Sequence, residues 1–185
     1  LAEAAPGFGE PFAAVQACEQ LAALDLADEW APAYLPHVAP ARPVDSPWAP
    51  PPAVDALRDE PARLAGDGVV AVVGLHRLSA VEEALRSAPA AEAVTLAVVT
   101  SDAGELGPLA ALAVTELRHC LRAAVPARAW PRLQIVLPER TEAPLAAAAG
   151  VPAVSDATES AVRIRGGRIV ARADGYGACW AVGSH

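Results

Sequence analysis

Three short apolar runs constrain the fold of this chain more than any other feature. They are GVVAVVGL (residues 68–75), AVTLAVVTSD (93–102) and RLQIVLP (132–138). Continuous apolar runs of this length are typical of strands that are buried on both faces, as in parallel sheets. Segments with helical spacing separate them. This alternation predicts an α/β fold, layered, with a largely parallel central sheet.

The segments between these runs carry signals of helices. We expect helices over residues 79–88, 107–124 and 141–150, where apolar residues recur at helical spacing. Gly150 is suited to a C-terminal cap, because glycine adopts the left-handed conformation that often ends a helix. These helices would connect the parallel strands.

The C-terminal part of the chain predicts further elements. Residues 168–174 are expected to form a strand, and residues 178–182 another one. Asp156 is a candidate N-cap for a short helix over residues 157–164, because an aspartate side chain accepts hydrogen bonds from the first free backbone N–H groups of a helix.

The N-terminal third differs from the rest. Residues 11–30 have apolar side chains at helical spacing, Cys18 among them, and predict a helix. Residues 31–62 are rich in proline, which fixes φ and removes a backbone donor, so they predict an extended connector. We therefore divide the chain into an N-terminal helix with a proline-rich arm (1–62) and an α/β domain (63–185). The first residue is leucine rather than methionine, so the natural protein could extend upstream of it.

Charge and motif content exclude several classes of function. The net charge is −8, and an acidic chain repels the phosphates of nucleic acids and anionic lipids, so we expect no nucleic-acid or membrane partner. The chain contains neither GxGxxG nor GxxxxGK[ST], and its three cysteines form no CxxC pair. We therefore expect no cofactor, metal or redox dithiol, and expect Cys120 and Cys179 to pack in the core. With no visible signal peptide or membrane span, we expect a cytoplasmic protein.

The chain also resembles a known family in several segments. Residues 166–183, GGRIVARADGYGACWAVG, resemble the end of thiolase-fold condensing enzymes, especially the β-ketoacyl-ACP synthase III group. LQIVLPERTEAPLAAAAGVP resembles that family's strand, catalytic-histidine segment and following helix, and VSDATESAV resembles its asparagine-bearing turn and helix. These three pieces follow the family's order over about a third of the chain. AAVQACEQLAALDLA resembles the family's nucleophile elbow and puts Cys18 at the nucleophile's position.

This resemblance implies a degenerate subunit. In the family, a His and an Asn donate hydrogen bonds to the thioester carbonyl, but Glu139 stands where the His is expected and Asp156 where the Asn is expected. Carboxylates beside a developing enolate raise the barrier, and the loss of one oxyanion-hole donor alone costs about 3 kcal/mol. The resemblance therefore implies a non-catalytic, condensing-enzyme-like subunit in fatty-acid or polyketide biosynthesis. It would form an oligomer with a full-length condensing enzyme, or bind an acyl carrier protein.

Other interpretations of the same residues stay open. Cys18 is either the nucleophile of a cysteine-dependent acyltransferase or a small core thiol. Glu139 and Asp156 are either a carboxylate pair for acid–base catalysis or a solvated charge and a helix cap. His76 is a further catalytic candidate, because it follows the carboxyl end of a strand, where sites of α/β proteins gather.

A thioredoxin-like domain without its dithiol is the second fold that the sequence allows. The first two apolar runs and the hairpin-like SAVRIRGGRIVARADG suit it, and HRLS (76–79) stands where a CxxC pair would follow the first strand. The hairpin-like stretch also resembles the structural, non-catalytic half of polyketide ketoreductases. An antiparallel hairpin over residues 161–173 would favour the thioredoxin-like fold, whereas a helix over 157–164 would favour the condensing-enzyme fold.

Overall fold

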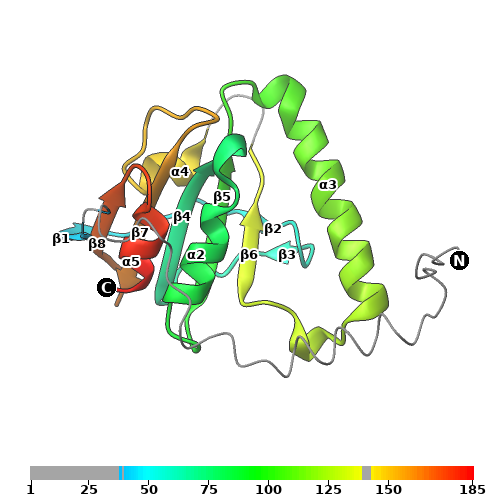
Figure 1. The fold of residues 1–185 in the computed structure, drawn as a ribbon, viewed down its shortest axis with the longest axis horizontal. Helices are drawn as coiled ribbons and strands as arrows, with labels where there is room; N and C mark the ends of the chain where they lie inside the picture. The colour runs from blue at the N-terminus through cyan, green and yellow to red at the C-terminus, as the bar shows by residue number, and fades with distance from the viewer. Residues whose placement is uncertain (1–37, 39, 139–142) are drawn as a thin grey trace, which may run out of the picture. The chain divides into compact units, whose positions relative to one another are not determined.

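The computed structural model describes residues 38, 40–138 and 143–185 (Figure 1). All of them belong to the second of two compact units, Pro32–His185. The centre of this unit is a six-stranded mixed sheet with helices on both sides. The predicted α/β class is therefore confirmed.

The parallel half of the sheet follows the three apolar runs. β4 (Gly68–Gly74) pairs with β5 (Ala93–Val99), and β5 pairs with β6 (Leu133–Val136), both in parallel. Every residue of β4 is buried, because both faces of this central strand are covered. α2 (Ala80–Ser87) connects β4 to β5, and α3 (Ala103–Ala124) lies between β5 and β6 in the chain. The strands and helices predicted for this half are confirmed.

The other half of the sheet is antiparallel and corrects a prediction. The residues expected to form a helix over 157–164 lie largely in β7 (Glu159–Arg165), which pairs antiparallel with β4 and with β8 (Arg168–Asp174). The turn residues Gly166 and Gly167 have φ values of 54° and 71°. A tight two-residue hairpin favours positive φ at both positions, and glycine adopts it without strain. The sheet is therefore mixed rather than largely parallel, and the hairpin that distinguishes the thioredoxin-like alternative is present.

The last element is a helix, so the strand predicted over residues 178–182 is wrong. α5 (Ala178–Gly183) begins directly after Gly177, whose φ is 80°. A short apolar run fits a buried helix as well as a buried strand, so periodicity could not separate the two. α5 packs against α2, and a Cβ on Gly183 would overlap the side chain of Ser87, so the two helices approach closely there.

The proline-rich connector contributes an edge strand. β1 (Arg42–Pro47) pairs antiparallel with β8, and its two prolines cannot donate hydrogen bonds to a further strand. The strand order of the sheet is β1-β8-β7-β4-β5-β6. β2 (Val54–Asp55) and β3 (Glu60–Pro61) form a small separate hairpin. Trp48 fixes the connector to the domain, because its buried indole N–H donates to the Leu64 carbonyl oxygen at 2.7 Å.

Each face of the sheet has its own core. Alternate residues of a strand point to opposite faces, so Ala71 and Val73 of β4 pack with α2 and α5, whereas Val70 and Val72 pack with α4 (Pro144–Ala148). Figure 1 shows α2 and α5 on the near face of the sheet and α4 on the far face. Only 4% of the residues are aromatic, so small aliphatic side chains fill most of both cores.

Candidate functional site

The carboxyl ends of β4 and β5 lie side by side, and the loop before β7 packs against them. The Gly74 N–H donates to the Thr158 carbonyl oxygen at 2.8 Å, and the His76 N–H donates to the Asp156 carbonyl oxygen at 2.9 Å. A Cβ on Gly74 would overlap the backbone of Ser155 and Asp156, so glycine permits this close approach. Ligand sites of α/β folds gather at the carboxyl ends of parallel strands. This end of the sheet is therefore the candidate site.

Asp156 holds the loop to the end of β5. Its two carboxylate oxygens accept hydrogen bonds from Thr100 Oγ1 and Ser101 Oγ, each at 2.5 Å. The hydrogen bonds from Ser101 and Thr100 lower the pKa of Asp156, and the charge of the neighbouring His76 adds to the effect. A carboxylate that stays ionised and has both oxygens bound is a poor general acid at neutral pH. The prediction of a helix cap is wrong, because a strand follows this loop.

His76 lies at the same place. It belongs to the single 3-10 turn η2 (Leu75–Arg77) that follows β4, and its side chain is exposed. The structure therefore brings together two of the four sequence candidates, His76 and Asp156. Among the described residues, however, the imidazole forms no hydrogen bond. A Ser–His–Asp triad needs the histidine between hydroxyl and carboxylate, whereas Ser101 binds Asp156 directly, so these three side chains do not form a triad.

A buried ion pair next to His76 was not found from the sequence. Arg77 donates from Nη2 and Nε to Glu159 Oε2, at 2.6 and 3.1 Å. On its other side, the guanidinium carbon of Arg77 lies 4.3 Å from the centre of the Tyr176 ring. The Glu159 side chain is 1% exposed, whereas Tyr176 is 58% exposed. Arg77 is thus fixed between a buried carboxylate and an exposed aromatic ring.

Cys179 lies beside this pair, in the first turn of α5. Its residue is 0% exposed, and its N–H is 3.4 Å from Glu159 Oε1. Burial in the first place, and the Glu159 carboxylate in the second, raise the pKa of the Cys179 thiol well above its usual value. Because the thiolate is the reactive form, this thiol is unreactive at neutral pH. Cys179 packs in the core as predicted, whereas Cys120 on α3 is exposed, contrary to the prediction.

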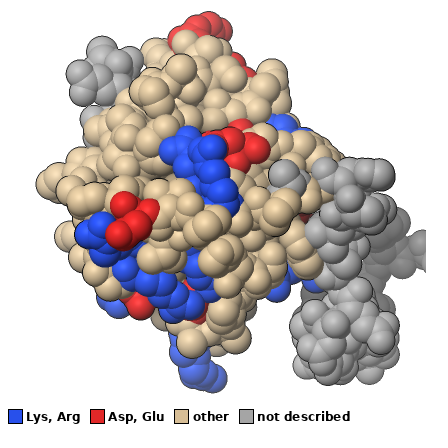
Figure 2. All heavy atoms as spheres, turned by 90° about the vertical axis from the view of Figure 1, so that its left-hand side faces the viewer, with Lys and Arg blue, Asp and Glu red and all other residues tan. Residues whose placement is uncertain are grey.

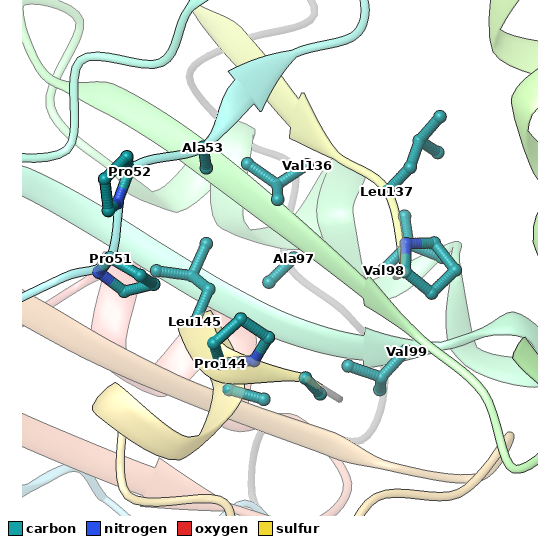
Figure 3. Close-up of a pocket in the computed structure, with 13 residues that line it drawn as sticks. Pro51, Pro52, Ala53, Ala97, Val98, Val99, Val136, Leu137, Pro144 and Leu145 are labelled. Atoms are coloured by element: carbon teal, nitrogen blue, oxygen red, sulfur yellow. The ribbon is translucent and has the colours of Figure 1, made fainter. Parts of the chain in front are cut away.

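An apolar pocket lies between the sheet and α4 (Figure 3). Its enclosed space is small, about 30 Å³. The side chains that line it come from the connector, β5, β6 and α4, among them Pro51, Ala97, Val136 and Leu145. None of the residues that line it is titratable. The pocket therefore offers apolar contact but no acid, base or nucleophile.

The sheet edge formed by β1 and β8 carries arginines that are paired with carboxylates (Figure 2). Asp174 binds Arg42 at 2.9 Å and Arg172 at 2.7 Å, and Asp45 binds Arg168. The hydrogen bond from Arg172 is the main reason why the pKa of Asp174 is lowered. Because positive and negative charges alternate along this edge, it lacks the continuous positive potential that attracts a polyanion.

The remaining two sequence candidates, Cys18 and Glu139, lie outside the described residues. Within the described part of the chain, no group of three His, Cys, Asp or Glu side chains is placed to hold a metal ion. Over residues 38, 40–138 and 143–185, no helix combines the length and the apolar character that a membrane span requires.

Comparison with known proteins identifies no family for this chain. No family model matches the chain, and no curated protein and no solved structure matches it. Function is therefore inferred from the topology and the site alone.

Proposed function

We propose that this chain contains a thioredoxin-like domain that lacks the redox dithiol and serves as a binding module. One observation carries the proposal: the antiparallel hairpin of β7 and β8 lies beside the parallel pair of β4 and β5, and α5 follows it. This is the feature by which the sequence separates the thioredoxin-like fold from the condensing-enzyme fold.

The segment HRLS explains why redox chemistry would be missing. His76 and Ser79 occupy the ends of the stretch where a CxxC pair would follow the first central strand. Neither side chain can form a disulfide. The thiol of Cys179 is buried and has a raised pKa, and Cys120 lies on α3, so neither replaces the missing pair.

Exposed side chains at the same site support a binding role. Leu78 is 43% exposed and Tyr176 is 58% exposed. Tyrosine and arginine are enriched among residues that dominate binding energy. Arg77 holds one face of the Tyr176 ring and is itself fixed by Glu159, so the aromatic ring is already ordered before a partner arrives. Such preorganisation reduces the entropic cost of association.

The condensing-enzyme interpretation has less support. It needs a helix after Asp156 and a closing strand that contains Trp180, and the chain forms β7 and α5 there. Pairing with a condensing enzyme or an acyl carrier protein stays a proposal, as does the likeness to half of a ketoreductase. A Cys18-dependent acyltransferase stays a prediction, because Cys18 lies outside the described residues.

The experiment restores the missing dithiol. In the double variant H76C/S79C, two residues at i and i+3 in helical conformation bring their Cβ atoms within about 5–6 Å, close enough for a disulfide after small adjustment. We expect this variant to form an intramolecular disulfide in air and to gain dithiothreitol-coupled reduction of insulin. Thiol alkylation followed by mass spectrometry measures the disulfide.

The matched control is S79C/E82C, which has the same spacing one turn further along α2. It has the same i, i+3 geometry and can form a disulfide as well, but it should reduce no insulin, because its thiols lie outside the position of the dithiol. If H76C/S79C forms no intramolecular disulfide, or if it reduces no more insulin than the control, the thioredoxin-like assignment is wrong.

A further inference from the structure

Two neighbouring hollows lie where the chain enters β1, beside the end of β8 and α5. The first has a volume of about 200 Å³. Its walls include Arg42, Arg172, Asp174 and Tyr176. The second has a volume of about 280 Å³, and five of its seven lining residues are apolar. Pro40 lines both hollows, so they are adjacent, and together they have the size of a small-ligand site, which is roughly 300–1,000 Å³.

The first hollow contains one positive charge that its carboxylate does not neutralise. Arg172 binds Asp174 through Nε and Nη2, at 2.9 and 2.7 Å. This contact is the main reason for the lowered pKa of Asp174. Arg42 donates to the same carboxylate through Nη2 alone, at 2.9 Å. Two guanidinium groups therefore share one carboxylate, and the surplus positive charge belongs to Arg42.

Arg42 keeps hydrogen-bond donors for a further anion. Its side chain is 65% exposed, and its Nε and Nη1 atoms donate to no described residue. A guanidinium group binds carboxylates through its fork of N–H donors, so Arg42 can accept a second carboxylate beside Asp174. The whole chain has a charge of −8, which repels a polyanion. A ligand with one negative charge therefore fits this hollow better than one with several.

The second hollow supplies apolar contact next to this charge. Its apolar walls come from the segment before β1 and from α5, namely Val38, Pro40, Ala41, Trp180 and Ala181. Ser184 and His185 complete the lining. No described Asp, Glu or Arg side chain lines this hollow. Hydrocarbon can therefore be buried there without taking a carboxylate or a guanidinium group out of water.

We propose that the two hollows form one site for a small aliphatic carboxylate. Its head group binds Arg42, and its hydrocarbon part lies across Pro40 against Trp180. Arg42 is two residues from Pro40, and two residues of chain span at most about 7 Å, so a chain of about six carbons reaches both hollows. Because the ion pair with Arg42 is exposed, binding is weak, in the millimolar range. The site does not depend on the thioredoxin-like assignment, because it involves neither His76 nor Ser79.

Titration of the full chain with hexanoate tests the site. In proton–nitrogen NMR spectra, the Arg42 Nε–H signal and the Trp180 indole N–H signal should both shift and saturate with one dissociation constant. Hexanamide has the hydrocarbon part but no charge, and acetate has the charge but almost no hydrocarbon, so each should bind at least about threefold more weakly. The proposal fails if either signal stays unchanged with hexanoate up to about 50 mM. It also fails if hexanamide or acetate binds as tightly as hexanoate.

Arg42→Gln tests the contact with the head group, and Arg168→Gln is its matched control. Arg168 is paired with Asp45 at the same sheet edge but lines neither hollow. Both ion pairs are exposed, so both variants should fold, which far-UV circular dichroism verifies. R42Q should raise the dissociation constant of hexanoate at least about threefold, to that of hexanamide, whereas R168Q should leave it unchanged. Equal dissociation constants of the two variants would overturn the assignment of the head group to Arg42.

Discussion

The ion pair between Glu92 and Arg163 joins the two halves of the sheet and allows a quantitative test. Glu92 lies just before β5, and Arg163 lies on β7. Arg163 Nη2 binds Glu92 Oε2 at 2.7 Å, and the two side chains are only 4% and 10% exposed, respectively. Arg163 Nη1 also donates to the carbonyl oxygens of Val182 and Gly183, at 2.9 and 3.1 Å. One guanidinium group thus binds the β5 end and the last turn of α5 together.

We expect Glu92→Ala to lower the free energy of unfolding by about 3–5 kcal/mol, because it leaves the charge of Arg163 buried and uncompensated. That is a large part of the 5–15 kcal/mol typical of a domain. The double variant E92A/R163M should lose less than E92A alone, since methionine keeps an apolar side chain and no buried charge remains. Its residual loss, about 1–3 kcal/mol, comes from carbonyl groups that lose their donor.

Urea unfolding followed by far-UV circular dichroism measures both variants. The control is Glu82→Ala, which removes an exposed ion pair with Arg86. The carboxylate side chain of Glu82 is 60% exposed. An exposed pair is worth at most about 1 kcal/mol. If Glu92→Ala costs no more than Glu82→Ala, or if the double variant is less stable than Glu92→Ala, the argument from the buried charge is refuted.

Three further predictions follow from the site. Gly74→Ala should lower the free energy of unfolding by about 1–3 kcal/mol, because the added Cβ would overlap backbone atoms. Gly66→Ala is the control, because a Cβ there meets no atom within 4 Å and should be near neutral. Equal melting temperatures of the two variants would contradict this. Iodoacetamide should label Cys120 in the folded protein, but Cys179 only after unfolding, because the Cys179 thiol is buried and its pKa is raised. Mass spectrometry measures the labelling, and equal labelling rates of the two cysteines in the folded protein would show that Cys179 is not buried. The pKa of Asp156 is lowered from its ordinary value of 3.8, so the ionised carboxylate stabilises the fold at pH values above 3.8, and this contribution is lost as the pH falls. Between about pH 5 and 2, wild type should therefore lose more stability than Asp156→Asn. Parallel curves of unfolding free energy against pH for the two proteins would contradict this.

The parallel half of the fold was predictable because strands buried on both faces appear in the sequence as continuous apolar runs. β4 is buried along its whole length, so each of its positions must be apolar or small. β7 has no continuous apolar run, because the buried Arg163 lies between Val162 and Ile164. This alternation before two glycines suggested a hairpin, but it did not exclude a helix over residues 157–164. Their conformation depends on the turn at Gly166-Gly167 and on pairing with β4, which is remote in sequence. Local propensity is overridden by such pairing.

The site was predictable only in part for a similar reason. His76 and Asp156 were recognised because one follows a strand and the other precedes an element, and the fold brings their loops together. Arg77 and Glu159 are 82 positions apart, and a single sequence contains no signal that pairs two charges over that distance. Tyr176 was noted within a Gly-Tyr-Gly turn, but its contact with Arg77 depends on the same long-range packing.

The state of the charged groups at this site supports the proposed binding role. A general acid or base needs a proton or a lone pair that is available near the working pH. Asp156 has both oxygens bound by hydroxyl groups and a lowered pKa, and Glu159 is buried against Arg77. These carboxylates therefore fix the loop and the arginine in place. What they leave at the surface is an ordered Tyr176 ring, the imidazole of His76 and an exposed leucine, a set that suits contact with another protein.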